Sequence, residues 1–194
     1  MRVRRLALPA LVAAATSCAP ASYPDQPAVV AAEATWCQAL GKVSEAGMGN
    51  GGMDTCKGAV PTGTAAVVKG MAKCLLARKE AGGDKPWDQG MMVAECKQEV
   101  FAKVNIDEAA AKETIQARCE RVVRCEKTGF AECVAATKSI DPYQRAQLYG
   151  IYNGAALHEV ASCLKSSSCG ADEDATQRAC YTPLEERMVW LPGQ

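Results

Sequence analysis

The sequence predicts an all-α fold made of two disulfide-stapled helical units. No stretch of the 194 residues alternates between apolar and polar side chains as a half-buried strand would. Clusters of glycine and proline instead divide the chain into segments of helical length. Eleven cysteines accompany a core rich in alanine, which favours helix but buries little area. Disulfides are therefore expected to supplement the core.

Breaks in the sequence set the bounds of the helices expected in the first unit. Pro27 is suited to the first position of a helix, and the run Gly47–Gly52 ends that helix. Further breaks occur at Pro61–Gly63 and Gly82–Pro86. We therefore expect helices over 27–46, 64–80 and 88–104, with a short helical turn around Cys56.

Capping residues set the bounds of the second unit. Asp107 is expected to cap a helix over 108–126, and a brief helix over 131–139 follows. Asp141 and Pro142 form a cap followed by proline at the first helical position, which predicts one long helix to Lys165. A last helix is expected from residue 174 to Pro183. Acidic residues favour its start, and Pro183 should end it.

The N-terminus has the three parts of an export signal. Residues 1–5 carry three arginines, residues 6–15 are apolar, and small polar residues precede Cys18. The apolar run is too short to span a membrane. The segment Ala15-Thr16-Ser17-Cys18 resembles a bacterial lipobox. This resemblance implies cleavage by signal peptidase II before Cys18 and acylation of Cys18 with diacylglycerol and a fatty acid such as palmitate.

The number of cysteines agrees with lipidation. An odd cysteine in an exported protein requires an explanation, and acylation of Cys18 leaves ten cysteines for pairing. Removing the signal also removes three arginines and no acid, so the mature chain is mildly acidic. Ordinary signal-peptidase cleavage, for example after Ala21, is the alternative.

Eight of the cysteines predict an internal repeat. Cys37, Cys56, Cys74 and Cys96 correspond in order to Cys119, Cys133, Cys163 and Cys180. The segments 67–75 and 156–164 also share the ending Ala-x-Cys-Leu. We therefore expect residues 27–106 and 107–194 to form a four-Cys unit and a six-Cys unit, after a signal peptide over 1–17 and an extended spacer over 18–26.

The two cysteines outside the repeat predict one disulfide. Cys125 and Cys169 each follow a repeated cysteine by six residues, and Val43 and Glu80 stand at those offsets in the first unit. Cysteines that are gained together are most simply partners, which predicts Cys125–Cys169. For the others we favour a nested arrangement, although sequence alone does not fix connectivity and pairing between the units is an alternative. The nested pairs are Cys119–Cys180, Cys133–Cys163, Cys37–Cys96 and Cys56–Cys74.

Composition argues against several function classes. The formal net charge of zero gives no basic surface for nucleic acid. No cysteines are spaced C-x-x-C, so zinc-ribbon, thioredoxin-type and haem-attachment motifs are missing. The single histidine, His158, is expected on a solvent-facing helix surface. We therefore expect no metal and no cofactor.

An enzyme is the least favoured class. A catalytic site would need carboxylates and lysines such as Glu132, Lys138 and Asp141, and nothing in the sequence brings these residues together. The expected catalytic set is therefore empty.

The cysteine layout C-x5-C-x7-C…C-x5-C-x10-C over residues 119–180, together with the signal, resembles cysteine-rich helical lipoproteins of myxobacterial-type Gram-negative bacteria. This resemblance implies a cell-envelope location and supplies no activity. Ala19 follows Cys18 in place of the aspartate associated with inner-membrane retention, which favours the outer membrane. We expect a non-catalytic binding or structural module, attached to the membrane by its lipid and open to an unidentified protein partner. The alternative is a secreted disulfide-rich inhibitor or toxin-like effector.

Overall fold

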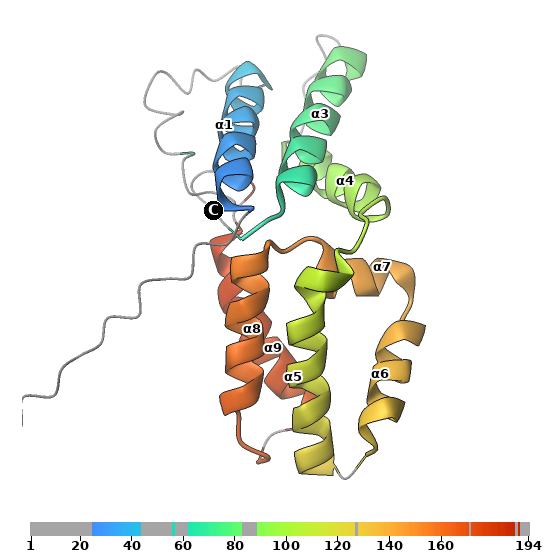
Figure 1. Cartoon of the computed structure of the whole chain (residues 1–194). Helices are drawn as coiled ribbons and strands as arrows, with labels where there is room; N and C mark the ends of the chain where they lie inside the picture. Colours follow the sequence, from blue (N-terminus) through green and yellow to red (C-terminus); the bar gives the residue numbers. More distant parts are fainter. Residues whose placement is uncertain are drawn as a thin grey trace, which may run out of the picture.

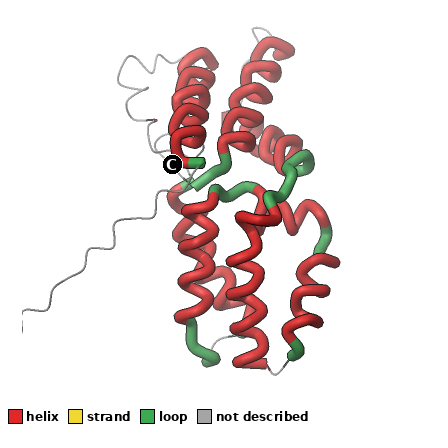
Figure 2. Tube along the Cα trace, in the orientation of Figure 1, coloured by secondary structure: helices red, strands yellow, loops and turns green. Residues whose placement is uncertain are grey.

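The computed structural model describes residues 25–43, 56, 62–82, 89–126, 128–170, 172–188 and 190. These residues are helical or in loops, with no strand among them and one isolated antiparallel bridge between Gly63 and Tyr152 (Figure 2). The all-α prediction is confirmed for this part of the chain. Its helices form two groups, one above the other in Figure 1.

The described part of the first half consists of three helices and the buried, helical residue Cys56. Helix α1 (Gln26–Val43) packs along α3 (Ala65–Gly82), and α4 (Gln89–Phe101) packs against α3 (Figure 1). These bounds lie within three residues of the expected ones at each end that is described. Residues 44–46 and the rest of the turn expected around Cys56 lie outside the described residues.

The second half is built around α5 (Glu108–Glu126). Helix α6 (Phe130–Ser139) and helix α8 (Gly154–Ser166) lie on opposite sides of α5, and α9 (Glu173–Arg187) packs against α8 (Figure 1). Asp107 caps α5 as expected, because its Oδ1 accepts hydrogen bonds from the amides of Ala109 at 2.9 Å and Ala110 at 3.2 Å.

The prediction of one long helix from Pro142 to Lys165 is wrong. Helix α7 (Pro142–Arg145) continues into a π-helical turn over Ala146–Gly150, and the chain is then non-helical until α8 begins at Gly154. The break is stabilised from outside the segment, because residues 151–153 hydrogen-bond to residues 62–64. Gly150 is needed in the wide turn, since a Cβ added there would lie 2.5 Å from Cγ1 of Val104.

The prediction that Pro183 ends the last helix is also wrong. Pro183 lies inside α9, which runs on to Arg187. Proline removes one backbone donor from a helix, but the burial of Leu184 directly after it favours continuation of the helical path. Asp172 caps α9 by accepting a hydrogen bond from the amide of Ala175 at 2.6 Å.

Five disulfides hold the fold together, and four of them join segments that follow one another along the chain. Cys125 and Cys169 are bonded, with 5.0 Å between their Cα atoms, as the sequence predicts. In each half the first repeated cysteine bonds the second and the third bonds the fourth. These pairs are Cys37–Cys56, Cys74–Cys96, Cys119–Cys133 and Cys163–Cys180.

The nested disulfides predicted above are therefore wrong. The structure contradicts Cys119–Cys180, Cys133–Cys163, Cys37–Cys96 and Cys56–Cys74. The arrangement of α5, α6 and α8 gives the reason for the second half. Cys133 is on α6 and Cys163 is on α8, and α5 stands between those helices (Figure 1). Each of the five bonds joins two cysteines of the same half, so no disulfide among the described cysteines connects the two halves.

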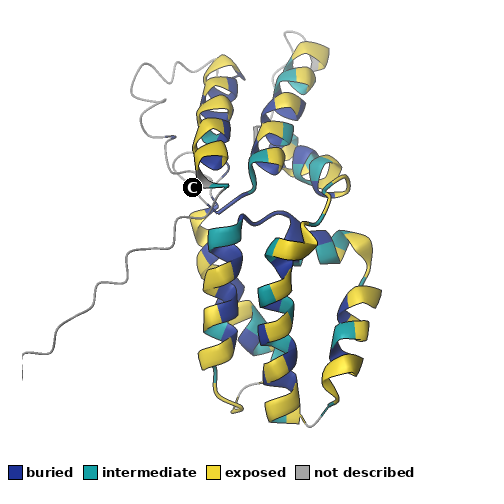
Figure 3. Cartoon of the chain, in the orientation of Figure 1, coloured by how far each residue is buried: buried dark blue, intermediate teal, exposed yellow. Residues whose placement is uncertain are grey.

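A continuous hydrophobic core runs through both halves. Trp36, Leu40 and Met71 belong to it in the first half, and Leu157 and Leu184 belong to it in the second. Helix α6 packs on α5 through a separate small cluster of Cys119, Val122, Cys133 and Val134. Figure 3 shows the buried faces turned inward and the exposed faces outward on both groups of helices. No helix in the described ranges is long and apolar enough to cross a membrane.

Candidate functional site

The two halves meet where two loop segments pair side by side. The amide of Thr64 donates to the carbonyl of Ile151 at 2.9 Å, and the amide of Asn153 donates to the carbonyl of Thr62 at 2.9 Å. These bonds surround the bridge between Gly63 and Tyr152. Residues 62–64 and 151–153 together form what we call the junction.

Asn153 fixes both sides of the junction. Its side chain is 1% exposed, and its Oδ1 caps α8 by accepting a hydrogen bond from the amide of Ala156 at 3.0 Å. Its Nδ2 donates to the carbonyl of Gly63 at 3.1 Å. Asp25, beside the start of α1, accepts a hydrogen bond from the amide of Gly154 at 2.9 Å. The first turn of α8 is thus held by residues of the first half.

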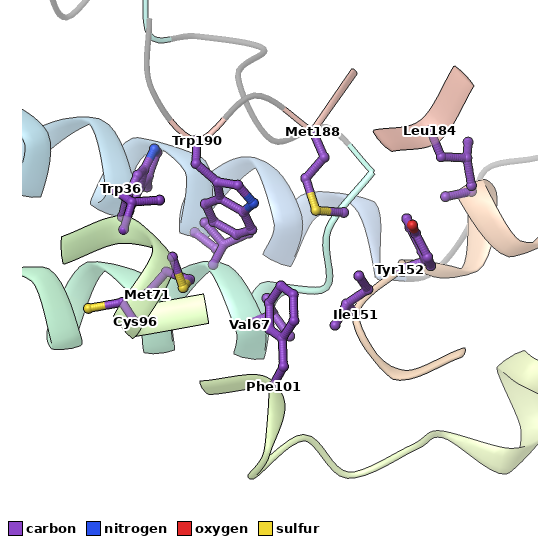
Figure 4. Close-up of a cluster of buried hydrophobic side chains, with 14 of the residues drawn as sticks. Trp36, Val67, Met71, Cys96, Phe101, Ile151, Tyr152, Leu184, Met188 and Trp190 are labelled. Atoms are coloured by element: carbon purple, nitrogen blue, oxygen red, sulfur yellow. The ribbon is translucent and has the colours of Figure 1, made fainter. Parts of the chain in front are cut away.

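The segment after α9 returns to the first half and closes its core. The rings of Trp190 and Trp36 are perpendicular, with centroids 5.3 Å apart, and Met188 lies beside Trp190 (Figure 4). Thr62 contributes a further link, since its hydroxyl donates to the carbonyl of Leu184 at 3.1 Å. These contacts hold the junction in place, and residues of the junction line two cavities, one on each side of Tyr152.

The larger cavity, the α3 cavity, has a volume of about 1050 Å³. It lies between α3, the connection from α4 to α5, and the π-helical turn, and small side chains of α3 line much of it. Its charged groups are largely engaged with one another. Glu99 accepts a hydrogen bond from Lys103 at 2.9 Å, and Arg78 forms ion pairs with Glu95 and Glu99. Lys73 also lines this cavity and is exposed.

The second cavity, the α9 cavity, has a volume of about 770 Å³. Three walls surround it, formed by the last turns of α4, the segment from Ile140 to Tyr152, and one face of α9. Residues 174, 177, 178, 181, 182 and 185 supply the α9 face, at the spacing of one side of a helix. Both cavity volumes are in the usual range for small-molecule sites, which often lie where two parts of a protein meet.

Tyr152 lines both cavities and therefore forms part of the partition between them. Its ring is 3% exposed and lies 5.5 Å from the ring of Tyr181. Burial raises the pKa of the Tyr152 hydroxyl, and the negative charge of Glu185 adds to this effect. Burial also raises the pKa of Tyr181, whose hydroxyl donates to the carbonyl of Leu148 at 2.9 Å. Both tyrosines are therefore neutral hydrogen-bonding groups at physiological pH.

Lys97 is the half-buried cation of the α9 cavity. It lies one helical turn before Phe101 on α4, and burial lowers the pKa of its amine. No carboxylate among the described residues forms an ion pair with it. Arg118, on the opposite side, is engaged by Glu173 at 2.5 Å. The α9 cavity thus combines an apolar lining with an amine whose charge is not compensated by a described carboxylate.

The residues weighed for catalysis are not assembled into a site. Asp141 caps α7 by accepting hydrogen bonds from the amides of Tyr143 and Gln144, while Glu132 and Lys138 are exposed on α6.

His158 is exposed, as expected, and its Nδ1 lies 2.8 Å from Oε2 of Glu113. No group of three or more His, Cys, Asp or Glu residues within the described ranges is placed to hold a metal. Cys18 lies outside the described residues.

Sequence reasoning missed both cavities. Their walls come from segments distant in the chain, and the break at residues 151–153 that shapes them was expected to be helix. One signal was present, because Tyr149 and Tyr152 begin the apolar stripe that continues into α8. All ten described cysteines are in disulfides, so the described chain offers no thiol for chemistry.

No protein-family model, no curated protein and no solved structure matches this chain.

Proposed function

We propose that this chain is an exported lipoprotein whose disulfide-stapled helical body acts as a non-catalytic binding or structural module on the cell envelope. A lipid on Cys18 anchors it, with the outer membrane as the favoured site. The observation that carries the proposal is the use of cysteines. Five disulfides engage all ten cysteines from Cys37 onward, which leaves Cys18 as the remaining cysteine of the sequence.

The two cavities at the junction support a binding role. They are enclosed by elements of both halves, and their charged residues are not grouped as an acid, a base and a nucleophile. A module of this kind presents a preformed surface to a ligand or to an envelope protein. Nucleic acid is not among the proposed partners, because the net charge of the chain is zero.

We also propose that the body arose from a duplicated four-Cys helical unit. The same order of bonds in both halves supports this proposal, with first to second and third to fourth. The helices correspond as well, since α1 packs on α3 as α5 packs on α8. In this scheme α4 corresponds to α9, and the segment around Cys56 corresponds to α6.

Mass spectrometry of the N-terminal peptide from the membrane fraction tests the lipoprotein proposal. We expect a mature N-terminus at Cys18 that carries a diacylglyceryl thioether and an N-acyl group. The variant Cys18→Ser should lack the lipid and lose this processing, whereas Ser17→Ala should retain both. Density-gradient separation should place the native protein with the outer membrane. A mature N-terminus after Ala21, or recovery of most of the protein from the culture supernatant, would overturn the proposal and favour a secreted inhibitor or effector.

A further inference from the structure

The α9 cavity has a floor made of large apolar side chains. Six of these residues are at most 8% exposed in the folded chain: Phe101, Ile151, Tyr152, Tyr181, Met188 and Trp190. Five of them lie around the same region in Figure 4, where Trp190 and Met188 stand above Phe101 and Ile151. A cavity of about 770 Å³ with such a floor favours a ligand with an apolar part.

The polar groups of this cavity include three with unused hydrogen-bond donors, on Lys97, Gln177 and Arg118. Lys97 is half-buried and has no ion-pair partner among the described residues. Nε2 of Gln177 and Nη1 of Arg118 are buried, and neither atom has an acceptor within hydrogen-bonding distance. A buried donor without an acceptor costs free energy, so an acceptor supplied from outside would be favoured.

Other charges near Lys97 are engaged elsewhere or open to water. On its own helix, Glu95 and Glu99 form ion pairs with Arg78. Across the cavity, Asp174 and Glu185 of α9 are exposed, so water solvates their carboxylates. Arg178 is the remaining basic residue on that wall and is exposed as well. Lys97 is therefore the one half-buried cation here that has no described counter-ion.

The charge of the ligand follows from this arrangement. A phosphate dianion is best held by two cations or by a bidentate arginine, and Arg118, the partly buried arginine of this cavity, already bonds Glu173 at 2.5 Å through Nε and Nη2. One lysine and one amide donor that line the same cavity suit a carboxylate, which carries a single charge and two acceptor oxygens. The arrangement does not resemble a metal site, because the described residues gather no metal-binding cluster.

We propose that the α9 cavity binds a small apolar carboxylic acid, with its carboxylate on Lys97 and Gln177 and its apolar part on the floor formed by Phe101 and Trp190. This inference rests on the binding role proposed above and names its ligand class. The binding lysine is half-buried before the ligand arrives, which accounts for the lowered pKa of its amine.

Binding of 4-phenylbutyrate, measured by titration calorimetry, tests the inference. The full chain is purified in its oxidised form and held in lipid nanodiscs, with empty nanodiscs as the blank. We expect 4-phenylbutyrate to bind at least about tenfold more tightly than the neutral 4-phenylbutanamide, the ratio expected for one charge-assisted hydrogen bond. Equal binding of the acid and the amide, or binding of neither, would overturn the inference.

Two variants locate the site. Lys97→Gln should abolish the preference for the acid, whereas Lys73→Gln, in the α3 cavity, should leave it unchanged. Preference for the acid that persists in Lys97→Gln would contradict the proposed site. Thermal unfolding shows whether Lys97→Gln still folds, and we expect no loss of stability because a buried charge is removed. Phosphate at the same concentration should not displace 4-phenylbutyrate. Displacement would show that the site does not require a ligand with an apolar part and would overturn the inference.

One more readout separates this inference from the lipoprotein proposal. The intact mass of the same preparation reports acylation of Cys18 independently of ligand binding. Binding of 4-phenylbutyrate by unacylated protein would leave the cavity inference standing and overturn the anchor. Acylated protein that does not bind 4-phenylbutyrate would support the anchor and overturn the cavity inference. In protein whose lysines carry ¹³C-methyl groups, the pKa of Lys97 should also rise when the acid binds, because a carboxylate then stabilises its charged form.

Discussion

The first and second halves of the molecule share an order of disulfides but differ in how their outer ends are closed. Two bonds hold the first half, whereas the second half has a third bond, Cys125–Cys169. Cys125 lies in the last turn of α5, and this end of α5 points away from the first half in Figure 1. The added bond therefore fixes the region that the junction does not reach.

The packing around the added bond is more polar than the core of the first half. Arg121 is 1% exposed and donates hydrogen bonds to the hydroxyls of Ser167 and Thr176 at 3.0 and 2.7 Å. Arg124 donates to the carbonyl of Ser167 at 3.0 Å. The first half buries Trp36 and Met71 instead. Net gains from hydrogen bonds are modest, so a covalent link supplies the stability that apolar burial supplies in the first half.

Removing the bond Cys125–Cys169 should cause the largest loss in the free energy of unfolding among the variants compared here. The double variant Cys125→Ala/Cys169→Ala opens a loop with a sequence separation of 44 residues. In the chain-entropy model, this change lowers the free energy of unfolding by about 4 kcal/mol. Urea denaturation monitored by circular dichroism measures the loss, and amide exchange should rise first around residues 167–170.

The exposed residue Val123 on the same helix provides the control. Val123→Ala should change the free energy of unfolding by less than about 0.5 kcal/mol. If the double variant lowers the free energy of unfolding by an equally small amount, the polar contacts of Arg121 and Arg124 hold the end of α5 without the disulfide.

A middle-sized effect is expected from separating the halves at the junction. Asn153→Ala removes both the cap of α8 and the hydrogen bond to Gly63, and it leaves a buried carbonyl without that donor. We expect a loss of about 2 kcal/mol in the free energy of unfolding. Thermal unfolding followed by calorimetry should show the two halves melting less cooperatively than in the native protein.

Asp172→Ala is the matched variant for this test. Asp172 caps α9 in the same way but is exposed and makes no described contact with the first half. Its loss should cost about 1 kcal/mol and leave the unfolding transition equally sharp. Equal costs for the two caps would show that Asn153 acts only on its own helix.

The smallest expected effect concerns a carboxylate that links two helices in the second half. Glu113 of α5 accepts hydrogen bonds from Lys165 of α8 at 2.8 Å and lies 2.8 Å from His158. The hydrogen bond from Lys165, followed by that from His158, holds the pKa of Glu113 below its usual value. Its contribution to stability is therefore complete above the unfolded-state pKa and is lost as the pH falls through the folded-state pKa.

Glu113→Gln should accordingly lower the free energy of unfolding by about 0.5 kcal/mol at neutral pH, since the pair is largely exposed. The difference from the native protein should vanish under acidic conditions, where Glu113 is protonated. Urea midpoints measured across the acidic range check this dependence. Glu132→Gln, on the exposed face of α6, is the control, and its urea midpoint at neutral pH should match that of the native protein.

Local signals predicted much of this fold. Asp107 and Asp141 marked the starts of α5 and α7, and glycine and proline clusters separated the helices of the first half. The bond Cys125–Cys169 was also predictable, because both cysteines lack counterparts in the first half. These features depend on the residues themselves and on their immediate neighbours.

The errors arose where distant segments decide the local structure. The helical pattern around Ile151 is strong, but Thr62 and Thr64 hydrogen-bond to residues 153 and 151 and hold the break open. The nested disulfides failed for a related reason, since the sequence contains no signal for the position of α5 between α6 and α8. The two cavities depend on the same long-range packing, so their walls could not be predicted either.

The pairing of the cysteines has a consequence for the order in which the protein can be oxidised. A chain is synthesised from its N-terminus, and Cys37 can meet Cys56 before any later cysteine exists. The bond between Cys74 and Cys96 can likewise close before residue 108 has been added. In the second half, Cys125 emerges before Cys133, the partner of Cys119, and Cys169 emerges before Cys180, the partner of Cys163. The first half can therefore mature vectorially, whereas in the second half a wrong partner emerges before the right one for every bond.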